Sequence, residues 1–223
     1  MNVDDKIKKE ISCILIELTN HLMINGSMVF FSGLLYGKLG ISLFFFHYCR
    51  YTGNPLYNEY ALYLVDLVKS QLHEDYPLDY ERGLAGVGAG FDYLKKYRYF
   101  DIGDDFMHQI DSKIIKAIGY ERRINILTGF GRYLLSRYEN KPTIKDSLIQ
   151  LESYLPQSID TLIKDIHKDK ISEIVNSFNL SNLDELFLKN QDFGFQGGYA
   201  GLGLALLSLM ENESIFWINL LQT

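Results

Sequence analysis

A glycine-rich figure followed by a bulky apolar run recurs along this chain and constrains its fold more than any other feature. Its copies are residues 33–46, 83–94, 127–135 and 197–207. Taking Gly37, Gly86, Gly129 and Gly201 as equivalent points, the copies lie 49, 43 and 72 residues apart. Spacings of this order indicate a repeated helical unit, which fixes the architecture before any local pattern does.

Glycine inside a helix is costly, because it destabilises the helix by roughly 1 kcal/mol relative to alanine. A feature that recurs at this cost needs a packing reason. We expect glycines at a helix start to let its backbone lie against a neighbouring helix, while the following Leu, Phe and Val residues fill the core. The alternative is a phosphate-binding loop, but such loops follow a strand and occur once. No strand pattern precedes any copy, so close helix packing is favoured.

Apolar and amphipathic helical patterns alternate along the chain. Inner helices, apolar nearly all round, are predicted at residues 34–51, 83–97 and 199–210. A first helix that Asp4 or Asp5 can cap, and amphipathic outer helices, are predicted at residues 4–25, 55–72 and 104–118. Shorter broken helices are predicted within 143–192, and no stretch is typical of a strand. We therefore predict one all-α domain over residues 1–223, built from sequential helical hairpins that stack as an arc or as a ring.

Composition excludes several classes of protein. The net charge of −6 and the lack of a Lys/Arg cluster argue against a nucleic-acid partner. The charged N-terminal segment is unlike a signal peptide, and the apolar run 41–46 is far too short to cross a membrane. Two cysteines do not form a disulfide framework, so we expect a cytoplasmic protein without a membrane partner. The sequence leaves the oligomeric state open.

The glycine copies resemble those of a known family. Residues 33–40 read Gly-Leu-Leu-Tyr-Gly-Lys-Leu-Gly, and Phe-Phe-Phe-His-Tyr-Cys-Arg-Tyr-Thr-Gly-Asn-Pro-Leu-Tyr follows at 44–57. With the copies at 83–91 and 198–206, this pattern resembles the lanthionine synthetase C-like family over roughly residues 30–221, notably short members from gut Bacteroidetes. The resemblance implies an α/α toroid whose inner helices begin at glycines, with a central pocket and a role in the maturation of a ribosomally synthesised peptide.

The family resemblance also implies a zinc ion held by two cysteines and a histidine, one cysteine adjacent to the histidine. The zinc lowers the pKa of a substrate thiol, whose thiolate adds to a dehydrated residue and closes a thioether ring. This chain has no Cys-His pair, and its cysteines are Cys13 and Cys49. His47 and Cys49, two residues apart on a helix, point to nearly opposite sides. Where the family carries a histidine in a Gly-Leu-x-His-Gly copy, the first copy here has Tyr36.

We therefore expect neither zinc nor another cofactor in this chain. The resemblance then favours a divergent member that binds a precursor peptide or a partner peptide-modifying enzyme, and whether it is catalytic stays open. Residues near the predicted inner-helix starts should converge on any pocket. These candidates are Tyr36, Lys38, Asp79, Glu81, Arg82, Asn125 and Gln196.

Asp79, Glu81 and Arg82 are the candidates best equipped for chemistry. Hydrolases and epimerases on α/α toroids use paired carboxylates as acid and base, with one pKa raised by burial. A carbohydrate-active enzyme that uses Asp79 and Glu81 is accordingly the alternative function. The same residues also suit an ordinary helix start, where the helix dipole favours acidic side chains and Arg82 pairs with one of them. His47, among aromatic residues, is expected to be a hydrogen-bonded core histidine, and a scaffold without a pocket is the third hypothesis.

Overall fold

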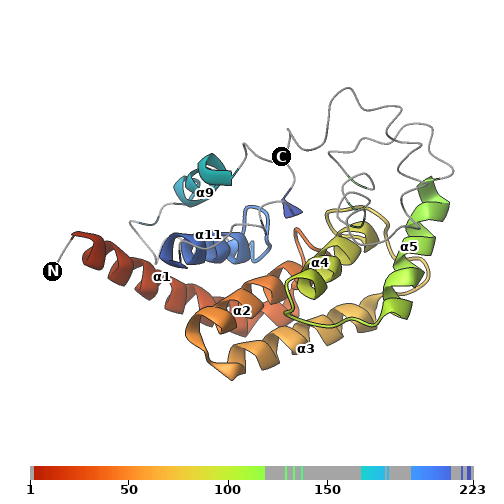
Figure 1. Cartoon of the computed structure of the whole chain (residues 1–223), viewed down its shortest axis with the longest axis horizontal. Coiled ribbons are helices and arrows are strands. Elements are labelled where there is room, and N and C mark those ends of the chain that lie inside the picture. Colours follow the sequence, from red (N-terminus) through yellow and green to blue (C-terminus); the bar gives the residue numbers. More distant parts are fainter. Residues whose placement is uncertain are drawn as a thin grey trace.

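The computed structural model describes residues 3–118, 129, 133, 137, 167–178, 180, 192–211, 217 and 220–221, and the elements in these residues are all helices (Figure 1). They are α1 (Val3–Asn25), the 3-10 helix η1 (Gly26–Met28), α2 (Lys38–Thr52), α3 (Pro55–Gln71), α4 (Leu84–Lys96), α5 (Asp104–Ile118), α9 (His167–Asn176) and α11 (Tyr199–Glu211). The all-α prediction is confirmed. Most of the third glycine copy, and most of the stretch 143–192, lie outside the described residues.

The break between α2 and α3 shows how local sequence sets the helix bounds. Gly53 follows α2 in the left-handed conformation, with a φ of 69°, and its N–H donates to the Cys49 carbonyl at 2.8 Å. The Asn54 side chain then accepts from the Leu56 N–H at 3.1 Å, and Pro55 is the first residue of α3. Gly53, Asn54 and Pro55 therefore end one helix and begin the next within three residues.

The helices form an inner and an outer set. In α4 every residue from Leu84 to Leu94 is buried, and α2 and α11 are buried almost as completely. The outer helices bury one face each: α3 packs along α2, α5 along α4 and α1 along α11 (Figure 1). The predicted assignment of inner and outer helices is therefore confirmed for these pairs.

The last inner helix returns to the first. Helix α2 packs against α11 and also against α4, so the order in space is α11, α2, α4. Helix α1, near the N-terminus, covers α11, near the C-terminus (Figure 1). Helix packing thereby joins the first helix of the chain to the last inner helix. Whether the hairpins stack as an arc or as a ring stays a prediction.

Glycines allow the close approach of the inner helices. A Cβ added at Gly203 of α11 would overlap the Phe44 ring of α2, and one at Gly90 of α4 would meet the Leu39 side chain of α2 at 2.6 Å. A Cβ at Gly88 would overlap the ring of Tyr133, a residue of the third glycine copy. The predicted packing role of these glycines is confirmed.

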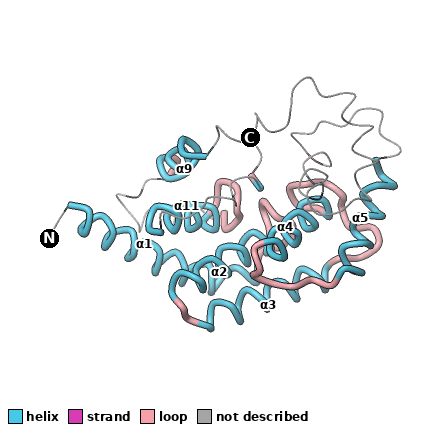
Figure 2. Tube along the Cα trace, viewed as in Figure 1, coloured by secondary structure: helices cyan, strands magenta, loops and turns pink. Residues whose placement is uncertain are grey.

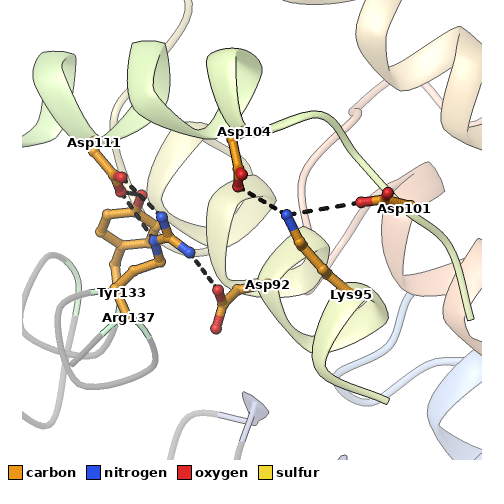
Figure 3. A network of polar contacts seen from close by, with 7 residues as sticks. All are labelled: Asp92, Lys95, Asp101, Asp104, Asp111, Tyr133 and Arg137. Atoms are coloured by element: carbon orange, nitrogen blue, oxygen red, sulfur yellow. Dashed lines mark hydrogen bonds and ion pairs between the residues drawn. The ribbon is translucent and has the colours of Figure 1, made fainter. Parts of the chain in front are cut away.

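A buried charge cluster joins Tyr133 of the third glycine copy, and Arg137 shortly after it, to α4 and α5 (Figure 3). The Arg137 guanidinium forms ion pairs with Asp92 of α4 and with Asp111 of α5, the latter at 2.8 Å between Nη2 and Oδ2. The Tyr133 hydroxyl donates to Asp111, and burial raises the pKa of Tyr133, so the hydroxyl keeps its proton. All four side chains are almost inaccessible to solvent. A single guanidinium therefore bridges two buried carboxylates inside the protein.

Candidate functional site

Three glycine copies begin their helices with the same loop. In each copy the first helical N–H donates to the carbonyl seven residues earlier, which closes the loop against the helix start. The pairs are Lys38 N to Phe31 O at 3.0 Å, Leu84 N to Pro77 O at 2.7 Å and Tyr199 N to Asp192 O at 3.0 Å. These amides, which an isolated helix start leaves unpaired, are consequently used within the loop itself.

The structure corrects the register that we inferred for the repeat. Gly37 corresponds to Gly83 and Gly198, because each is the residue before its helix and faces the backbone four residues earlier. A Cβ at Gly37 would lie 2.5 Å from the Gly33 nitrogen, and one at Gly83 would lie 2.6 Å from the Asp79 nitrogen. Pairing Gly37 with Gly86 and Gly201 was wrong. Each loop carries glycines three residues apart, so the pattern aligns equally well on either one.

Gly40, Gly86 and Gly201 form the second equivalent set. A Cβ at any of them would overlap the carbonyl oxygen six residues earlier, which belongs to Leu34, Tyr80 or Phe195 respectively. Gly129, which we grouped with Gly37, Gly86 and Gly201, has a left-handed φ of 58° and open space where a Cβ would lie. Its backbone therefore does not share the geometry of the other three.

Leu35 joins the three loops through its main chain. Its N–H donates to the Glu81 carbonyl at 3.0 Å, and its carbonyl accepts from the N–H groups of Phe195 at 2.7 Å and Gln196 at 3.0 Å. Figure 2 shows the loop before α2 beside the loop before α11. We call the surface formed by residues 31–37, 77–83 and 192–198 the mouth. Of the predicted candidates it contains Tyr36, Asp79, Glu81, Arg82 and Gln196.

The mouth carries charges of both signs around Tyr36. Burial raises the pKa of the Tyr36 hydroxyl, the Glu81 and Asp192 carboxylates raise it further, and Arg82 lowers it. The hydroxyl therefore stays protonated at neutral pH and can both donate and accept a hydrogen bond. Asp192 is not among the candidates predicted from the sequence. Its only signal is its place in the repeat: it lies seven residues before Tyr199, as Phe31 lies seven residues before Lys38.

Asp79 and Glu81 lie in the mouth but differ in what their side chains do. Asp79 accepts the Arg82 N–H at 2.7 Å through Oδ1, and this bond across three residues fixes the shape of the loop. Glu81 is exposed, and its main-chain carbonyl serves Leu35. Their predicted action as an acid–base pair stays a prediction.

Arg82 lies across two aromatic rings of the first loop. Its Cζ is 4.6 Å from the centre of the Phe31 ring and 5.6 Å from that of Tyr36. Gln196 lies in the third loop, where its Oε1 is buried and finds no donor among the described residues. The first and second loops are therefore held together by side chains as well as through Leu35.

Lys38 does not belong to the mouth, and Asn125 lies outside the described residues. The Lys38 ammonium is buried, donating to the Val29 carbonyl and to Gln71 Oε1, the latter at 3.1 Å. Burial lowers its pKa. Both acceptors are neutral: one lies in the segment before α2 and the other at the end of α3. Lys38 therefore joins these two parts of the chain, and we assign it no role at the mouth.

His47 is a core histidine held between two tyrosines, as expected from its aromatic surroundings. Its Nε2 lies 2.9 Å from the Tyr93 hydroxyl and its Nδ1 lies 2.9 Å from the Tyr99 hydroxyl. The Arg50 guanidinium stacks on Tyr99, 3.7 Å from the ring centre. Burial, with a contribution from Arg50, lowers the pKa of His47 to about 3. The imidazole is therefore neutral at physiological pH, with one nitrogen donating and the other accepting.

The lowered pKa of His47 makes stability depend on pH. Above the ordinary pKa of 6.5 the histidine is neutral whether the protein is folded or unfolded, and below it only the unfolded chain takes up the proton. Between pH 7 and pH 5 we expect His47 to cost about 2 kcal/mol of unfolding free energy. Urea titrations should show a smaller loss over this range for His47→Gln than for the wild type. Equal losses would contradict the assignment.

The comparison with known families decides the identity of the chain. The family model described as lanthionine synthetase C-like protein matches residues 31–212. The chain belongs to the lanthionine synthetase C-like family. The match begins at the first residue of the mouth and includes all three of its loops together with α2, α4 and α11. Searches of curated proteins and of solved structures give no significant match. In the described part of this lanthionine synthetase C-like protein, no helix is both long and apolar enough to cross a membrane.

The described residues do not fit the zinc ion that the lanthionine synthetase C-like resemblance implies. Cys13 is exposed on α1 and Cys49 is partly buried on α2, while both ring nitrogens of His47 are paired with tyrosines. Among these residues no three His, Cys, Asp or Glu side chains are arranged to hold a metal. We therefore derive no chemical step through zinc.

Elemental mass spectrometry of the full chain tests this disagreement with the family chemistry. For protein purified without chelator and exchanged into metal-free buffer, we expect zinc at the level of the buffer blank. Structural and catalytic zinc sites need three or four protein ligands, and the described residues do not bring three such side chains together. About one zinc per chain, retained after dialysis, would contradict the expectation and make a thioether cyclase the leading hypothesis.

Proposed function

We propose that this lanthionine synthetase C-like protein takes part in the maturation of a ribosomally synthesised peptide by binding a precursor peptide at the mouth. The observation that carries the proposal is that the matched region includes all three mouth loops, which Leu35 ties into one surface. Exposed Glu81 and Arg82, beside partly exposed Tyr36, offer hydrogen-bonding and charged groups to a peptide. We further propose a divergent, non-catalytic role, because the zinc donors are lacking among the described residues.

A partner modifying enzyme is the second candidate ligand, because the family acts on peptides that other enzymes modify. We do not propose the carbohydrate-active alternative. Asp79 already uses one carboxylate oxygen on the Arg82 N–H. Paired-carboxylate catalysis would need both groups to be directed at a substrate.

Binding of a precursor peptide tests the proposal. By fluorescence anisotropy with labelled peptide, we expect Tyr36→Ala and Arg82→Ala each to weaken binding about tenfold or more, as central aromatic and arginine contacts do. Tyr63→Ala is the matched control, because Tyr63 is half exposed on the outer helix α3. Unchanged affinity in both mouth variants would contradict a peptide site at the mouth. Binding of a partner modifying enzyme, but not of the peptide, would favour the second candidate.

A further inference from the structure

In the part of the chain that the structure describes, no hydrogen bond uses the N–H donors of the Arg82 guanidinium. Arg82 is exposed, and its guanidinium lies over the Phe31 and Tyr36 rings. Within the described residues its hydrogen bonds involve only main-chain atoms: its N–H donates to Asp79, and its carbonyl accepts from the Tyr76 hydroxyl. The guanidinium forms no ion pair there, even though Glu81 is its neighbour in sequence.

Stacking prepares such a group to bind an anion. A guanidinium presents five N–H donors in a planar fork, and this fork matches the two oxygens of a carboxylate. Cation–π contact with a ring leaves the edge of the fork free, while it restricts the long side chain. A restricted arginine therefore loses less conformational entropy when a ligand binds than an unrestrained surface arginine does.

We propose that Arg82 is a carboxylate-binding group of the mouth. The source of the carboxylate rests on the proposed function: it is either an acidic side chain or the C-terminal carboxylate of the peptide. Glu81 and Asp192 act on the same part of the mouth, as their effect on Tyr36 shows. Their repulsion weakens the binding of any anion at Arg82.

Arginine side-chain NMR signals of the full ¹⁵N-labelled chain test the proposal with small probes. The probes are N-acetylglycine for a C-terminal carboxylate, N-acetylglutamic acid α-amide for an acidic side chain, N-acetylglycinamide as the neutral control and inorganic phosphate. The Arg82→Lys variant assigns the Arg82 Nε–Hε signal and retains the charge. Arg98, an exposed arginine in the turn after α4, is the internal control.

We expect a carboxylate probe to shift the Arg82 signal with saturation at millimolar concentrations, while Arg98 shifts weakly and linearly. The probe with the tighter affinity identifies the source of the carboxylate. Phosphate should bind more weakly than either, and Glu81→Gln should tighten carboxylate binding about twofold to threefold. Phe31→Leu combined with Tyr36→Leu should weaken it about fivefold, because the rings no longer hold the guanidinium.

Three results would overturn the proposal: an Arg82 response equal to that of Arg98, tighter binding of phosphate, or unchanged affinity in the Phe31→Leu/Tyr36→Leu variant with a native spectrum. The Arg98 comparison needs no substitution, so misfolding of that variant does not leave the proposal untested. The probes are small molecules and not precursor peptides, so this experiment does not depend on whether the proposed function is right. Carboxylate binding at Arg82 without any affinity for the precursor peptide or the modifying enzyme would overturn only the proposed function.

Discussion

Replacing Gly86 with alanine is expected to lower the free energy of unfolding by about 3 kcal/mol, with urea denaturation as the measurement. The added Cβ would overlap the Tyr80 carbonyl oxygen, a backbone atom that cannot move away as a flexible side chain could. Tyr80 is itself buried, and its hydroxyl donates to the Leu220 carbonyl at 3.1 Å. The overlap would therefore strain the loop that begins α4 and loosen the contact with the C-terminal segment.

Gly103→Ala is the matched control for this substitution. Gly103 precedes α5, and a Cβ there would meet no atom within 4 Å. We expect Gly103→Ala to change the unfolding free energy by no more than about 1 kcal/mol, which is the usual size of a substitution at the residue before a helix. Equal losses in Gly86→Ala and Gly103→Ala would show that the glycine copies are not packed as described. Gly40→Ala and Gly201→Ala should behave like Gly86→Ala, because their added Cβ atoms would overlap the equivalent carbonyls.

Replacing Arg137 with methionine is expected to lower the unfolding free energy by about 3–5 kcal/mol. The substitution would remove the guanidinium that pairs with buried Asp92 and Asp111, and breaking a buried ion pair by removing one partner is strongly destabilising. Denaturant titration of the full chain at neutral pH measures the loss.

The reverse experiment removes the carboxylates as well. In Asp92→Asn/Asp111→Asn/Arg137→Met, no unpaired charge stays buried, so we expect the triple variant to recover at least about 1 kcal/mol of the loss. A triple variant less stable than Arg137→Met alone would mean that the penalty comes from lost packing around Arg137, and would contradict the charge explanation.

Much of the helical framework follows from local sequence. The apolar runs of α2, α4 and α11 and the amphipathic patterns of α3 and α5 mark inner and outer helices, because burial on all sides or on one side dictates composition. The glycine copies likewise give the family and the helix starts. Their register was wrong by one glycine, since the choice between Gly37 and Gly40 depends on which backbone atoms each one faces.

The mouth could be predicted only in part. Tyr36, Arg82 and Gln196 stand beside glycines that mark helix starts, so their position was visible from the repeat. The contacts of Leu35 are made by main-chain atoms, and nearly any residue there could supply them. Asp192 carries no motif, and its effect on Tyr36 depends on loops that are distant in sequence.

The Arg137 cluster could not have been predicted from local pattern. Arg137 lies 45 residues from Asp92 and 26 from Asp111, and none of these residues belongs to a recognisable motif. Only the packing of the third glycine copy against α4 and α5 places the three charges together. The stacking of Arg82 on Phe31 depends on the meeting of two loops in the same way.

Site-specific photo-crosslinking can show whether a precursor peptide binds at the mouth. A photoreactive phenylalanine analogue replaces Tyr36 in one variant and Tyr63, on the outer surface of α3, in another. After irradiation with the labelled precursor peptide, we expect a crosslinked product at position 36 that excess unlabelled peptide abolishes, and none at position 63. Crosslinking at position 63 alone, or none at position 36 when anisotropy shows that the peptide is bound, would contradict peptide binding at the mouth.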